Sequence, residues 1–282
     1  MHHYRYHALL LAALLVVGIG AFAQRRGGFG GYYGGIEHGD GPSPVFPKEG
    51  EFHFIRAEYA DLPGARRGFG MVSRNGRANG WWAQDWPDAD EHFSQGVQRL
   101  TRIDTGEPLH LAFDDDRLFD YPWVYATQTG YWGLNPTEAK RLGEFLERGG
   151  FLVVDDFWGS YEWDIFQETM ERVLPNHPIS DIALTDSVMH VLYDIQEKDL
   201  TYIPGTRHLR IGPGGAVTVQ LQGTTPAWRS ISDDKHHMVV AINFNTDVGD
   251  AWEYADSPQY PEAMTTLAYR YGVNYLIYSM TH

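Results

Sequence analysis

The chain of 282 residues contains no cysteine. A disulfide framework, a thiolate metal site, an iron–sulfur cluster and a cysteine nucleophile are therefore excluded. Basic residues are also scarce, with 22 Lys and Arg against 37 Asp and Glu and a formal net charge of −15 when histidines are neutral. Nucleic acids and anionic lipids carry the same sign of charge, so we expect neither as the main partner.

Several signatures of catalytic and metal-binding proteins are missing as well. The chain holds neither the G-x-S-x-G turn of serine hydrolases nor the G-x-x-x-x-G-K-[ST] loop of nucleotide-binding proteins. His236 and His237 would face opposite sides of an expected strand, while His190 and His208 lack a partner at metal-ligand spacing. The sequence therefore predicts no histidine metal site, and we expect neither a metal nor a cofactor.

The N-terminal residues have the pattern of a secretory signal. A short polar stretch at residues 2–7 precedes the apolar run Ala8–Ala23, which ends in the small-x-small sequence Ala21-Phe22-Ala23. The run is shorter than the stretch of about 20 residues that spans a bilayer, so we expect cleavage after residue 23 rather than an uncleaved anchor. The sequence therefore predicts an exported protein, periplasmic or extracellular, with no stable membrane span after cleavage. The absence of cysteine suits an oxidising compartment.

Two further segments follow the predicted signal peptide at residues 1–23. Residues 24–50 are rich in Gly, Tyr and Pro, a composition that favours irregular chain, and they predict a flexible tether. Residues 51–282 predict a single α/β domain. The whole chain is 43% hydrophobic and 21% charged, which is enough apolar material for a sizeable core.

Strand and helix patterns alternate along the predicted domain. Apolar alternation or continuous apolar runs predict strands at 51–56, 108–113, 123–127, 151–154, 216–221 and 237–244. Helical spacing predicts helices from an N-cap at Asp88 with Glu91 in a capping box, from Asn135 to Gly149, over 161–174 and over 261–271, whereas 273–278 fits a helix or a strand. The alternation predicts an open, mainly parallel α/β sheet with helices on both faces.

Acidic residues follow several of the expected strands. Ligands of open α/β sheets bind at the carboxyl ends of the strands, so these residues are candidates for a site. Asp155 and Asp156 are the catalytic candidates, as an acid–base pair or as ligands of a hard cation; the alternative is a helix cap and a structural ion pair. Asp247 follows a later strand, and Arg56 is the expected counter-charge. The run Asp114–Asp116 could bind a cation, but it is more typical of a solvated turn.

The loop before the first predicted helix is rich in tryptophan. Trp81, Trp82 and Trp86 could form a platform for a sugar ring, and filling of the core is the alternative for at least one of them. Their neighbours Asp85 and Asp90 could accept hydrogen bonds from ligand hydroxyl groups or cap the helix that follows.

Short motifs along residues 51–282 resemble, in the same order, those of a bacterial protein family. They are Phe54-x-Arg56-x-x-Tyr59, Trp82-x-x-Asp85-x-Pro87-x-Ala89-Asp90, Leu118-Phe119-x-Tyr121-Pro122-x-x-Tyr125, Gly149-Gly150-Phe151-Leu152, Asp155-Asp156, Asp247-x-Gly249, Trp252-Glu253 and Gly272-Val273-Asn274. The chain thus resembles the DUF4159 family, which is similar to class I glutamine-amidotransferase-like domains. The resemblance implies a flavodoxin-like sheet and no settled activity.

The chain departs from working amidotransferases at the nucleophile. Those enzymes carry a cysteine on the turn after a strand, paired with histidine, whereas Asp155-Asp156 stand after the corresponding strand here. Glutamine hydrolysis by the cysteine mechanism is therefore excluded.

Two hypotheses about function remain. The first is an exported, non-catalytic domain that binds a small polar ligand, a glycan or a protein partner. The second is a carboxylate-dependent hydrolase, with or without the assistance of a divalent cation, that acts on a carbohydrate-type substrate by analogy with sugar-associated relatives of the fold. The residues predicted to bind the ligand are Arg56, Tyr59, Trp82, Asp85, Asp90, Tyr125 and Asp247.

Overall fold

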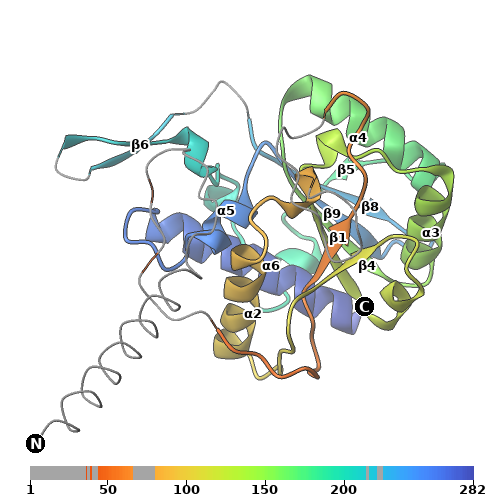
Figure 1. Ribbon diagram of the computed structural model, residues 1–282, viewed down its shortest axis with the longest axis horizontal. Coiled ribbons are helices and arrows are strands. Elements are labelled where there is room, and N and C mark those ends of the chain that lie inside the picture. The colour runs from red at the N-terminus through yellow and green to blue at the C-terminus, as the bar shows by residue number, and fades with distance from the viewer. Residues whose placement is uncertain (1–35, 37–38, 40–43, 66–79, 214–215, 221–224) are drawn as a thin grey trace, which may run out of the picture. The chain divides into compact units, whose positions relative to one another are not determined.

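The computed structural model describes residues 36, 39, 44–65, 80–213, 216–220 and 225–282 (Figure 1). The predicted signal peptide, residues 1–23, and most of the predicted tether lie outside the described residues, so both stay predictions. Within the described part of the chain, no helix has the length and apolar character needed to cross a membrane.

The strands form one large sheet and one small one. They are β1 (Ile55–Glu58), β2 (Leu109–Ala112), β3 (Trp123–Thr127), β4 (Phe151–Phe157), β5 (Ser180–Asp181), β6 (Leu209–Ile211), β7 (Val217–Val219), β8 (Ala227–Ser232) and β9 (Met238–Phe244). The large sheet has the order β2–β1–β3–β4–β9–β8–β5. Its first five strands in that order run parallel, whereas β8 is antiparallel to β9 and β5 is antiparallel to β8. The antiparallel pair β6–β7 projects from the domain (Figure 1).

Helices cover both faces of the large sheet. The α-helices are α2 (Asp88–Leu100), α3 (Pro136–Glu147), α4 (Gly159–Val173), α5 (Val248–Glu253) and α6 (Glu262–Thr281). Short 3-10 turns are η1 (Trp81–Ala83), η2 (Asp116–Asp120), η3 (Thr129–Tyr131), η4 (Ser187–Met189), η5 (Glu197–Asp199) and η6 (Thr206–His208). Helices α3 and α4 lie on one side of the sheet, and α2, α5 and α6 lie on the other (Figure 1).

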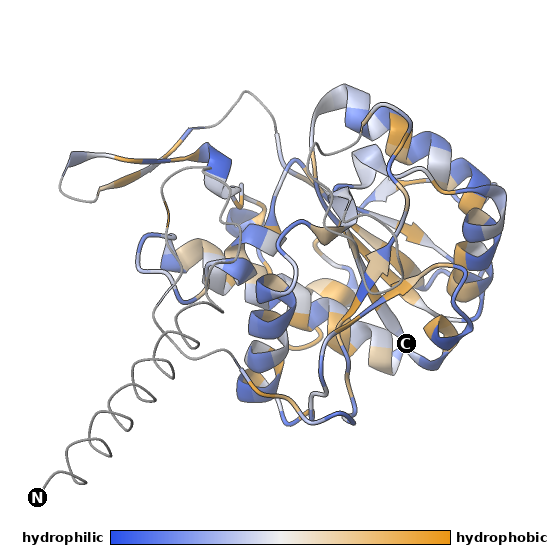
Figure 2. Ribbon diagram, in the orientation of Figure 1, coloured by the Kyte–Doolittle hydropathy of each residue, from blue (hydrophilic) through white to orange (hydrophobic). Residues whose placement is uncertain are grey.

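Alternate residues of the central strands supply two hydrophobic cores. On β3, Trp123 and Tyr125 belong to the core under α2, α5 and α6, whereas Val124 and Ala126 belong to the core under α3 and α4. Strands β4 and β9 are buried along their whole length, as expected of central strands covered on both faces. Figure 2 shows largely apolar strands beside helices that also carry polar residues.

The predicted α/β architecture with a mainly parallel sheet and helices on both faces is confirmed. The patterns at 108–113, 123–127, 151–154 and 237–244 correspond to β2, β3, β4 and β9. The predicted strand at 51–56 is displaced toward the C-terminus, since β1 spans Ile55–Glu58 and residue Phe52 contributes one isolated bridge to Thr105.

The structure corrects the predicted start of one helix and decides between two alternatives for another. Pro87, not Asp88, is the N-cap of α2, because helical hydrogen bonding already includes the bond from Glu91 N–H to the Pro87 carbonyl oxygen at 2.9 Å. Residues 273–278, which the sequence left open between a helix and a strand, continue helix α6 without a break at Gly272. A Cβ on Gly272 would lie 2.5 Å from the Phe93 ring and 2.6 Å from the Trp252 ring, so this glycine allows close side-chain packing against an unbroken helix.

The strand predicted at 216–221 is shorter than expected and lies outside the large sheet. Strand β7 spans Val217–Val219 and pairs with β6. The strand that pairs with β9 on the side away from β4 is β8, Ala227–Ser232, which was not predicted. Its sequence, AWRSIS, mixes polar and apolar residues without the long apolar run of a central strand, so a pattern-based search passes over it.

The predicted N-terminus of α3 is confirmed in detail. Asn135 Oδ1 accepts hydrogen bonds from the backbone N–H groups of Thr137 at 2.8 Å and Glu138 at 3.0 Å. Glu138 Oε2 in turn accepts from the Asn135 N–H at 2.9 Å, which completes a capping box, and Pro136 occupies the first helical position. Side chains thereby satisfy three backbone N–H groups at this helix end, and Pro136 has no N–H group that would need an acceptor.

Replacement of the α3 cap should weaken the domain by a small, measurable amount. We expect Asn135→Ala to lower the free energy of unfolding by about 1 kcal/mol, because it removes the acceptor for two helix N–H groups. Urea unfolding followed by circular dichroism measures the change. Lys140→Ala in the same helix removes only an exposed pair with Glu144 and should change stability by less than about 0.5 kcal/mol. Equal effects of the two substitutions would contradict the assignment.

Candidate functional site

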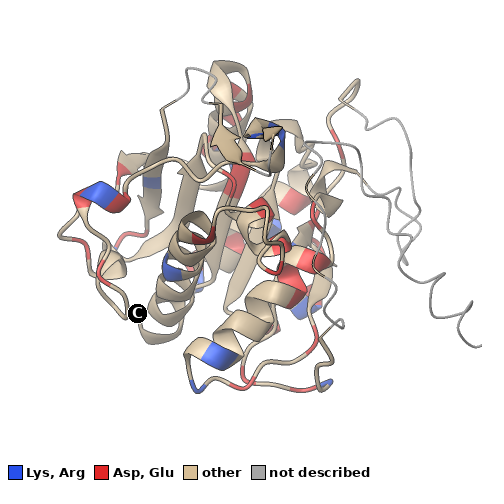
Figure 3. Ribbon diagram, turned by 90° about the vertical axis from the view of Figure 1, so that its left-hand side faces the viewer, with Lys and Arg blue, Asp and Glu red and all other residues tan. Residues whose placement is uncertain are grey.

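Acidic side chains from separate segments meet beyond the carboxyl ends of the central strands. Carboxylate oxygens of Asp85, Asp156 and Asp247 lie within 4.8 Å of one another, and so do those of Asp85, Asp250 and Glu253. These five residues are called the carboxylate cluster below. They come from the loop after η1, from the end of β4 and from the N-terminal cap and body of α5. Figure 3 shows acidic residues, in red, on several neighbouring elements of this region.

The cluster is almost completely shielded from solvent. Asp156 is 2% exposed, Asp247 3%, Asp250 6% and Asp85 7%, whereas Glu253 is partly exposed. Burial, reinforced by the neighbouring carboxylates, raises the pKa of Asp85, Asp247 and Glu253 well above their ordinary ranges. The site therefore favours a bound proton or a positively charged group over five free negative charges.

Asp156 is held in place by hydrogen bonds from three directions. Its φ of 48° is in the left-handed region, which Asp tolerates better than most residues. Its Oδ1 accepts from the Trp158 indole N–H at 2.6 Å and from the Arg207 guanidinium at 3.1 Å, and its Oδ2 accepts from the Gln128 side-chain amide. Burial raises the pKa of Asp156 while Arg207 opposes the rise.

Asp155 is a fully buried link between elements. Its Oδ2 accepts hydrogen bonds from the Tyr125 hydroxyl on β3 at 2.8 Å and from the Gly249 N–H on α5 at 2.9 Å. Its Oδ1 is buried without a hydrogen-bond partner. Burial, together with the charge of Asp156, raises the pKa of Asp155 to about 8. The two predicted catalytic candidates thus occupy different surroundings, and only Asp156 belongs to the carboxylate cluster.

Two glycines allow the carboxylates to approach the backbone closely. A Cβ on Gly249 would lie 2.7 Å from Tyr125 Oη, 2.9 Å from Asp85 Oδ2 and 3.6 Å from Asp247 Oδ1. A Cβ on Gly205 would lie 2.5 Å from Asp247 Oδ2. Asp247 also caps α5, since its Oδ1 accepts from the Asp250 N–H at 2.8 Å. A larger residue at either glycine would fill the space that the carboxylates occupy.

Arg56 and Asp90, both predicted to bind a ligand, form a separate buried ion pair. Arg56 Nε donates to Asp90 Oδ1 at 3.1 Å, its Nη2 donates to Asp90 Oδ2, and its Nη1 donates to the Gln84 carbonyl oxygen at 3.0 Å. Both side chains are fully buried. The guanidinium lies over the Tyr125 ring, 4.8 Å from its centre. The charge of Arg56 is therefore directed mainly to Asp90 and not to the carboxylate cluster.

The remaining predicted binding residues lie in the core. The Tyr59 hydroxyl donates to the carbonyl oxygens of Thr127 at 2.6 Å and Gln128 at 3.1 Å. Trp82 is 1% exposed and packs on His110, with ring centroids 5.1 Å apart. Trp82 therefore fills the core, which is the alternative that the sequence analysis gave for at least one of the three tryptophans.

The acidic run at 114–116 has the features of a surface turn. Asp115 caps η2 through the Arg117 N–H at 2.9 Å and pairs with the Arg117 guanidinium at 2.6 Å. The Asp116 side chain is 97% exposed and pairs with Arg141. These contacts agree with the solvated turn that the sequence favours.

Aromatic side chains lie beside the carboxylate cluster; Trp158, Tyr202 and His208 are called the aromatic wall below. Trp158 is partly exposed, and its ring lies 4.9 Å from the Arg207 guanidinium, 4.5 Å from the His208 ring and 5.7 Å from the Tyr202 ring. The Arg207 side chain is 38% exposed and reaches Asp156 from the solvent side. Burial and the charge of Arg207 lower the pKa of His208 to about 4, so this imidazole is neutral at physiological pH.

Sequence reasoning missed four residues of this region. Asp250 and Glu253 are three residues apart on α5, a spacing that places both on one helix face, but no helix was predicted there. Trp158 follows the acidic pair by two positions, and Arg207 lies far from it in the sequence. Only the short i, i+3 spacing of the α5 carboxylates could have been found from the sequence.

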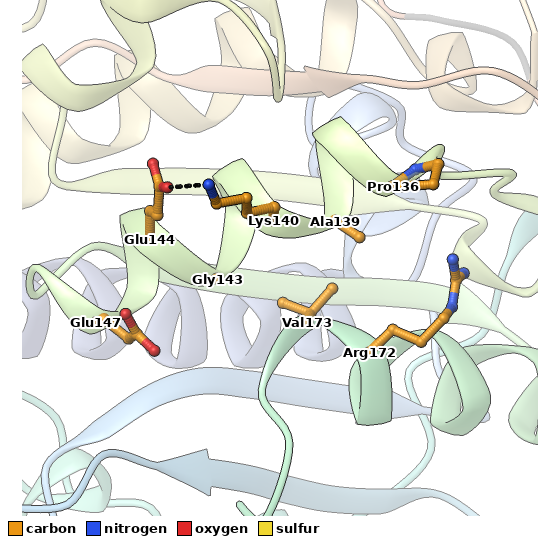
Figure 4. A pocket seen from close by; sticks show the side chains of 8 residues that line it. All are labelled: Pro136, Ala139, Lys140, Gly143, Glu144, Glu147, Arg172 and Val173. Carbon is orange, nitrogen blue, oxygen red and sulfur yellow. Dashed lines mark ion pairs between the residues drawn. The ribbon is translucent and has the colours of Figure 1, made fainter.

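A groove of about 510 Å³ lies elsewhere, between α3 and α4 (Figure 4). It is lined by Pro136, Ala139, Lys140, Gly143, Glu144, Glu147, Arg172 and Val173. The two helices can come close because residue 143 is a glycine; a Cβ at this position would lie only 2.5 Å from the Val173 carbonyl oxygen. The groove shares no residue with the carboxylate cluster and carries only an exposed ion pair between Lys140 and Glu144, so it has no chemistry to add to the site.

The fold and site together define an α/β domain with a buried acidic site at the carboxyl ends of its parallel strands. The chain belongs to the DUF4159 family, described as a domain of unknown function, and residues 69–280 match it. The family membership inferred from the ordered motifs is thereby confirmed, and the match includes every member of the carboxylate cluster. A comparison with curated proteins gives no match.

Loss of Asp90 should destabilise the domain strongly, because Arg56 would remain buried without its carboxylate. We expect Asp90→Ala to lower the free energy of unfolding by about 3–5 kcal/mol, whereas the double substitution Arg56→Met with Asp90→Leu should lower it by much less. Urea unfolding of both variants makes the comparison. A single variant as stable as the wild type would show that the pair does not support the fold.

The stability of the protein should depend on the ionisation of Asp155. The carboxyl group of an unfolded chain has a pKa near 3.9, and the folded state holds the proton up to a pH of about 8. The folded state therefore binds more protons over this interval, and this group makes stability fall as the pH rises from about 4 to about 8. Asn at position 155 can accept the same two hydrogen bonds, so Asp155→Asn should be more stable relative to the wild type at pH 8 than at pH 5.

Urea unfolding at the two pH values tests this expectation. EDTA should be present, so that no cation neutralises the neighbouring carboxylates. A stability difference between variant and wild type that stays constant from pH 5 to pH 8 would contradict the raised pKa of Asp155.

Proposed function

We propose that this domain binds a small polyhydroxylated ligand of carbohydrate type at the carboxylate cluster and its aromatic wall. The observation that carries the proposal is the excess of hydrogen-bond acceptors at the strand ends. Ionised carboxylates only accept hydrogen bonds, and Asp85 Oδ2 is buried without a donor. A ligand rich in hydroxyl groups supplies the donors that such a site needs, as buried polar atoms are expected to be paired.

The aromatic side chains beside the cluster support the same ligand class. Trp158 offers a partly exposed apolar face while its indole N–H holds Asp156 at 2.6 Å. The combination of an aromatic face with fixed carboxylates suits a ring that has apolar C–H faces and polar hydroxyl edges. Arg207, which contacts Asp156, and Glu253 are partly exposed residues of the same region.

The topology supports a site at this edge. The strand order β2–β1–β3–β4–β9 follows the 2-1-3-4-5 order of flavodoxin-like folds, in which ligands bind beyond the carboxyl ends of the strands. We therefore assign the domain to the flavodoxin-like class and keep its likeness to amidotransferase-like domains as part of the proposal. The chain has no cysteine, so the ligand is not glutamine bound for cysteine-dependent hydrolysis.

Binding is better supported than catalysis. A general acid must reach the proton acceptor of its substrate directly or through one water. Burial raises the pKa of Asp155 to about 8, but this residue is fully buried, and its Oδ2 is occupied by Tyr125 and Gly249. The ligand-binding hypothesis needs no such contact. The exported location predicted from residues 1–23 is part of this proposal and would place the domain where free saccharides are encountered.

Thermal unfolding with a panel of saccharides tests the proposed function. A saccharide that binds the folded protein should raise the apparent stability by about 2.7 kcal/mol at a hundredfold excess over its Kd. Trp158→Ala should weaken that binding at least tenfold, because it removes the aromatic face and a donor to Asp156. Tyr161→Ala is the matched control, since Tyr161 is 71% exposed on α4. The proposal fails if no saccharide stabilises the protein, or if Trp158→Ala binds as the wild type does.

A further inference from the structure

We propose that the carboxylate cluster holds one hard divalent cation, Ca²⁺ or Mg²⁺, with Asp85, Asp156 and Asp247 as its protein ligands. The sequence paired Asp156 with Asp155 as possible ligands of a hard cation; the present inference comes instead from the convergence of Asp85, Asp156 and Asp247 in space. It rests on the proposed function because the cation would occupy the same site and offer its open coordination positions to ligand hydroxyl groups.

The distances and the donor type fit such an ion. One oxygen from each of the three carboxylates lies within 4.8 Å of the other two. Two oxygens that contact one Ca²⁺ ion at about 2.4 Å are at most about 4.8 Å apart, and every pair among the three carboxylates falls within this limit. Carboxylate oxygens are the ligands that hard cations prefer, whereas the softer metals favour thiolate or imidazole.

The positive charges of the described residues leave the cluster unbalanced. Arg207 reaches Asp156, and the guanidinium of Arg56 is taken by Asp90. The three proposed ligands nevertheless bring one carboxylate oxygen each within 4.8 Å of the other two. Like charges at this spacing repel one another, and a cation between them removes the repulsion.

Asp85 provides an independent indication of a missing ligand. Its side chain is 7% exposed and its Oδ2 has no hydrogen-bond donor. This oxygen points to the space beside Gly249, where Asp247 Oδ1 also lies. A buried carboxylate oxygen without a partner, aimed at two other carboxylates, is expected where an ion completes the site.

The three ligands are also oriented from outside. Gln128, Trp158 and Arg207 donate to Asp156, and the Asp250 N–H donates to Asp247 Oδ1. Hydrogen bonds of this kind fix the direction in which metal-binding carboxylates point. The arrangement therefore holds at least two of the ligands in position before an ion enters.

The second group of acidic residues is less suited to be the main site. It shares Asp85 but adds Asp250 and Glu253. Glu253 is partly exposed. We therefore assign the ion to the fully buried group and expect a stoichiometry of one.

Calorimetric titration of the purified full-length protein, stripped with EDTA and dialysed, tests the inference. Addition of CaCl2 or MgCl2 should show one site with a Kd below about 10⁻³ M. Asp85→Asn and Asp247→Asn should each weaken binding at least tenfold. Asn tolerates the φ of 63° at position 85 and is a good N-cap at position 247, so both backbones are preserved.

The stability of the metal-free variants separates a ligand from a merely structural residue. Removal of one charge relieves repulsion, so metal-free Asp85→Asn and Asp247→Asn should be at least as stable as the metal-free wild type. Asp234→Asn is the matched control, because the Asp234 side chain is 99% exposed on the turn before β9, at the opposite end of that strand, and it should bind like the wild type.

Luminescence of Tb³⁺ gives a second readout of position. Tryptophan transfers excitation to Tb³⁺ bound nearby, and the Trp158 indole N–H lies 2.6 Å from Asp156 Oδ1. Excitation of tryptophan should therefore produce Tb³⁺ emission that CaCl2 displaces. Asp85→Asn should lose most of this emission, and Asp234→Asn should keep it.

The outcomes also separate this inference from the proposed function. The inference is overturned if neither cation binds the wild type, or if Asp85→Asn and Asp247→Asn bind it unchanged. Saccharide binding that is equal in EDTA and in CaCl2 supports the proposed function and contradicts a cation at the saccharide site. Cation binding without any saccharide binding supports the cation site and contradicts the proposed function.

Discussion

One buried oxygen, Oδ2 of Asp155, joins the elements on which the acidic site is built. It accepts hydrogen bonds from the Tyr125 hydroxyl on β3 and from the Gly249 N–H at the start of α5, while Asp155 itself belongs to β4. These bonds hold α5 against the carboxyl ends of the strands. Since α5 carries Asp250 and Glu253 and begins at the Asp247 cap, the positions of three of the five residues of the carboxylate cluster follow from this contact.

The opposing constraint is electrostatic. Burial of several carboxylates in one place is unfavourable unless protons, cations or hydrogen-bond donors compensate for the lost water. The domain supplies some compensation through Arg207, Trp158 and Gln128 at Asp156. It leaves Asp85 Oδ2 and Asp155 Oδ1 without donors. A region that gives up stability in this way is typical of binding and catalytic sites rather than of a structural core.

The buried pair of Arg56 and Asp90 shows how similar residues serve a different purpose. The guanidinium makes a bidentate contact with Asp90 and donates to the Gln84 carbonyl oxygen, so its hydrogen bonds go to these groups and not to the cluster. Tyr125 lies between the two systems, with Arg56 over its ring and Asp155 at its hydroxyl. The ion pair fixes β1 to α2, and the cluster remains available to an outside partner.

The sequence by itself determined the class of fold, the family and part of the site. Continuous apolar runs identified β4 and β9, and the Asn135 capping box located α3, because these signals depend on nearest neighbours along the chain. Asp85, Asp156 and Asp247 were candidates because they follow strands or a tryptophan-rich loop. Only the tertiary structure decided that these three meet while Arg56 turns to Asp90, since the partner of a long-range charge is set by chain packing and not by local pattern.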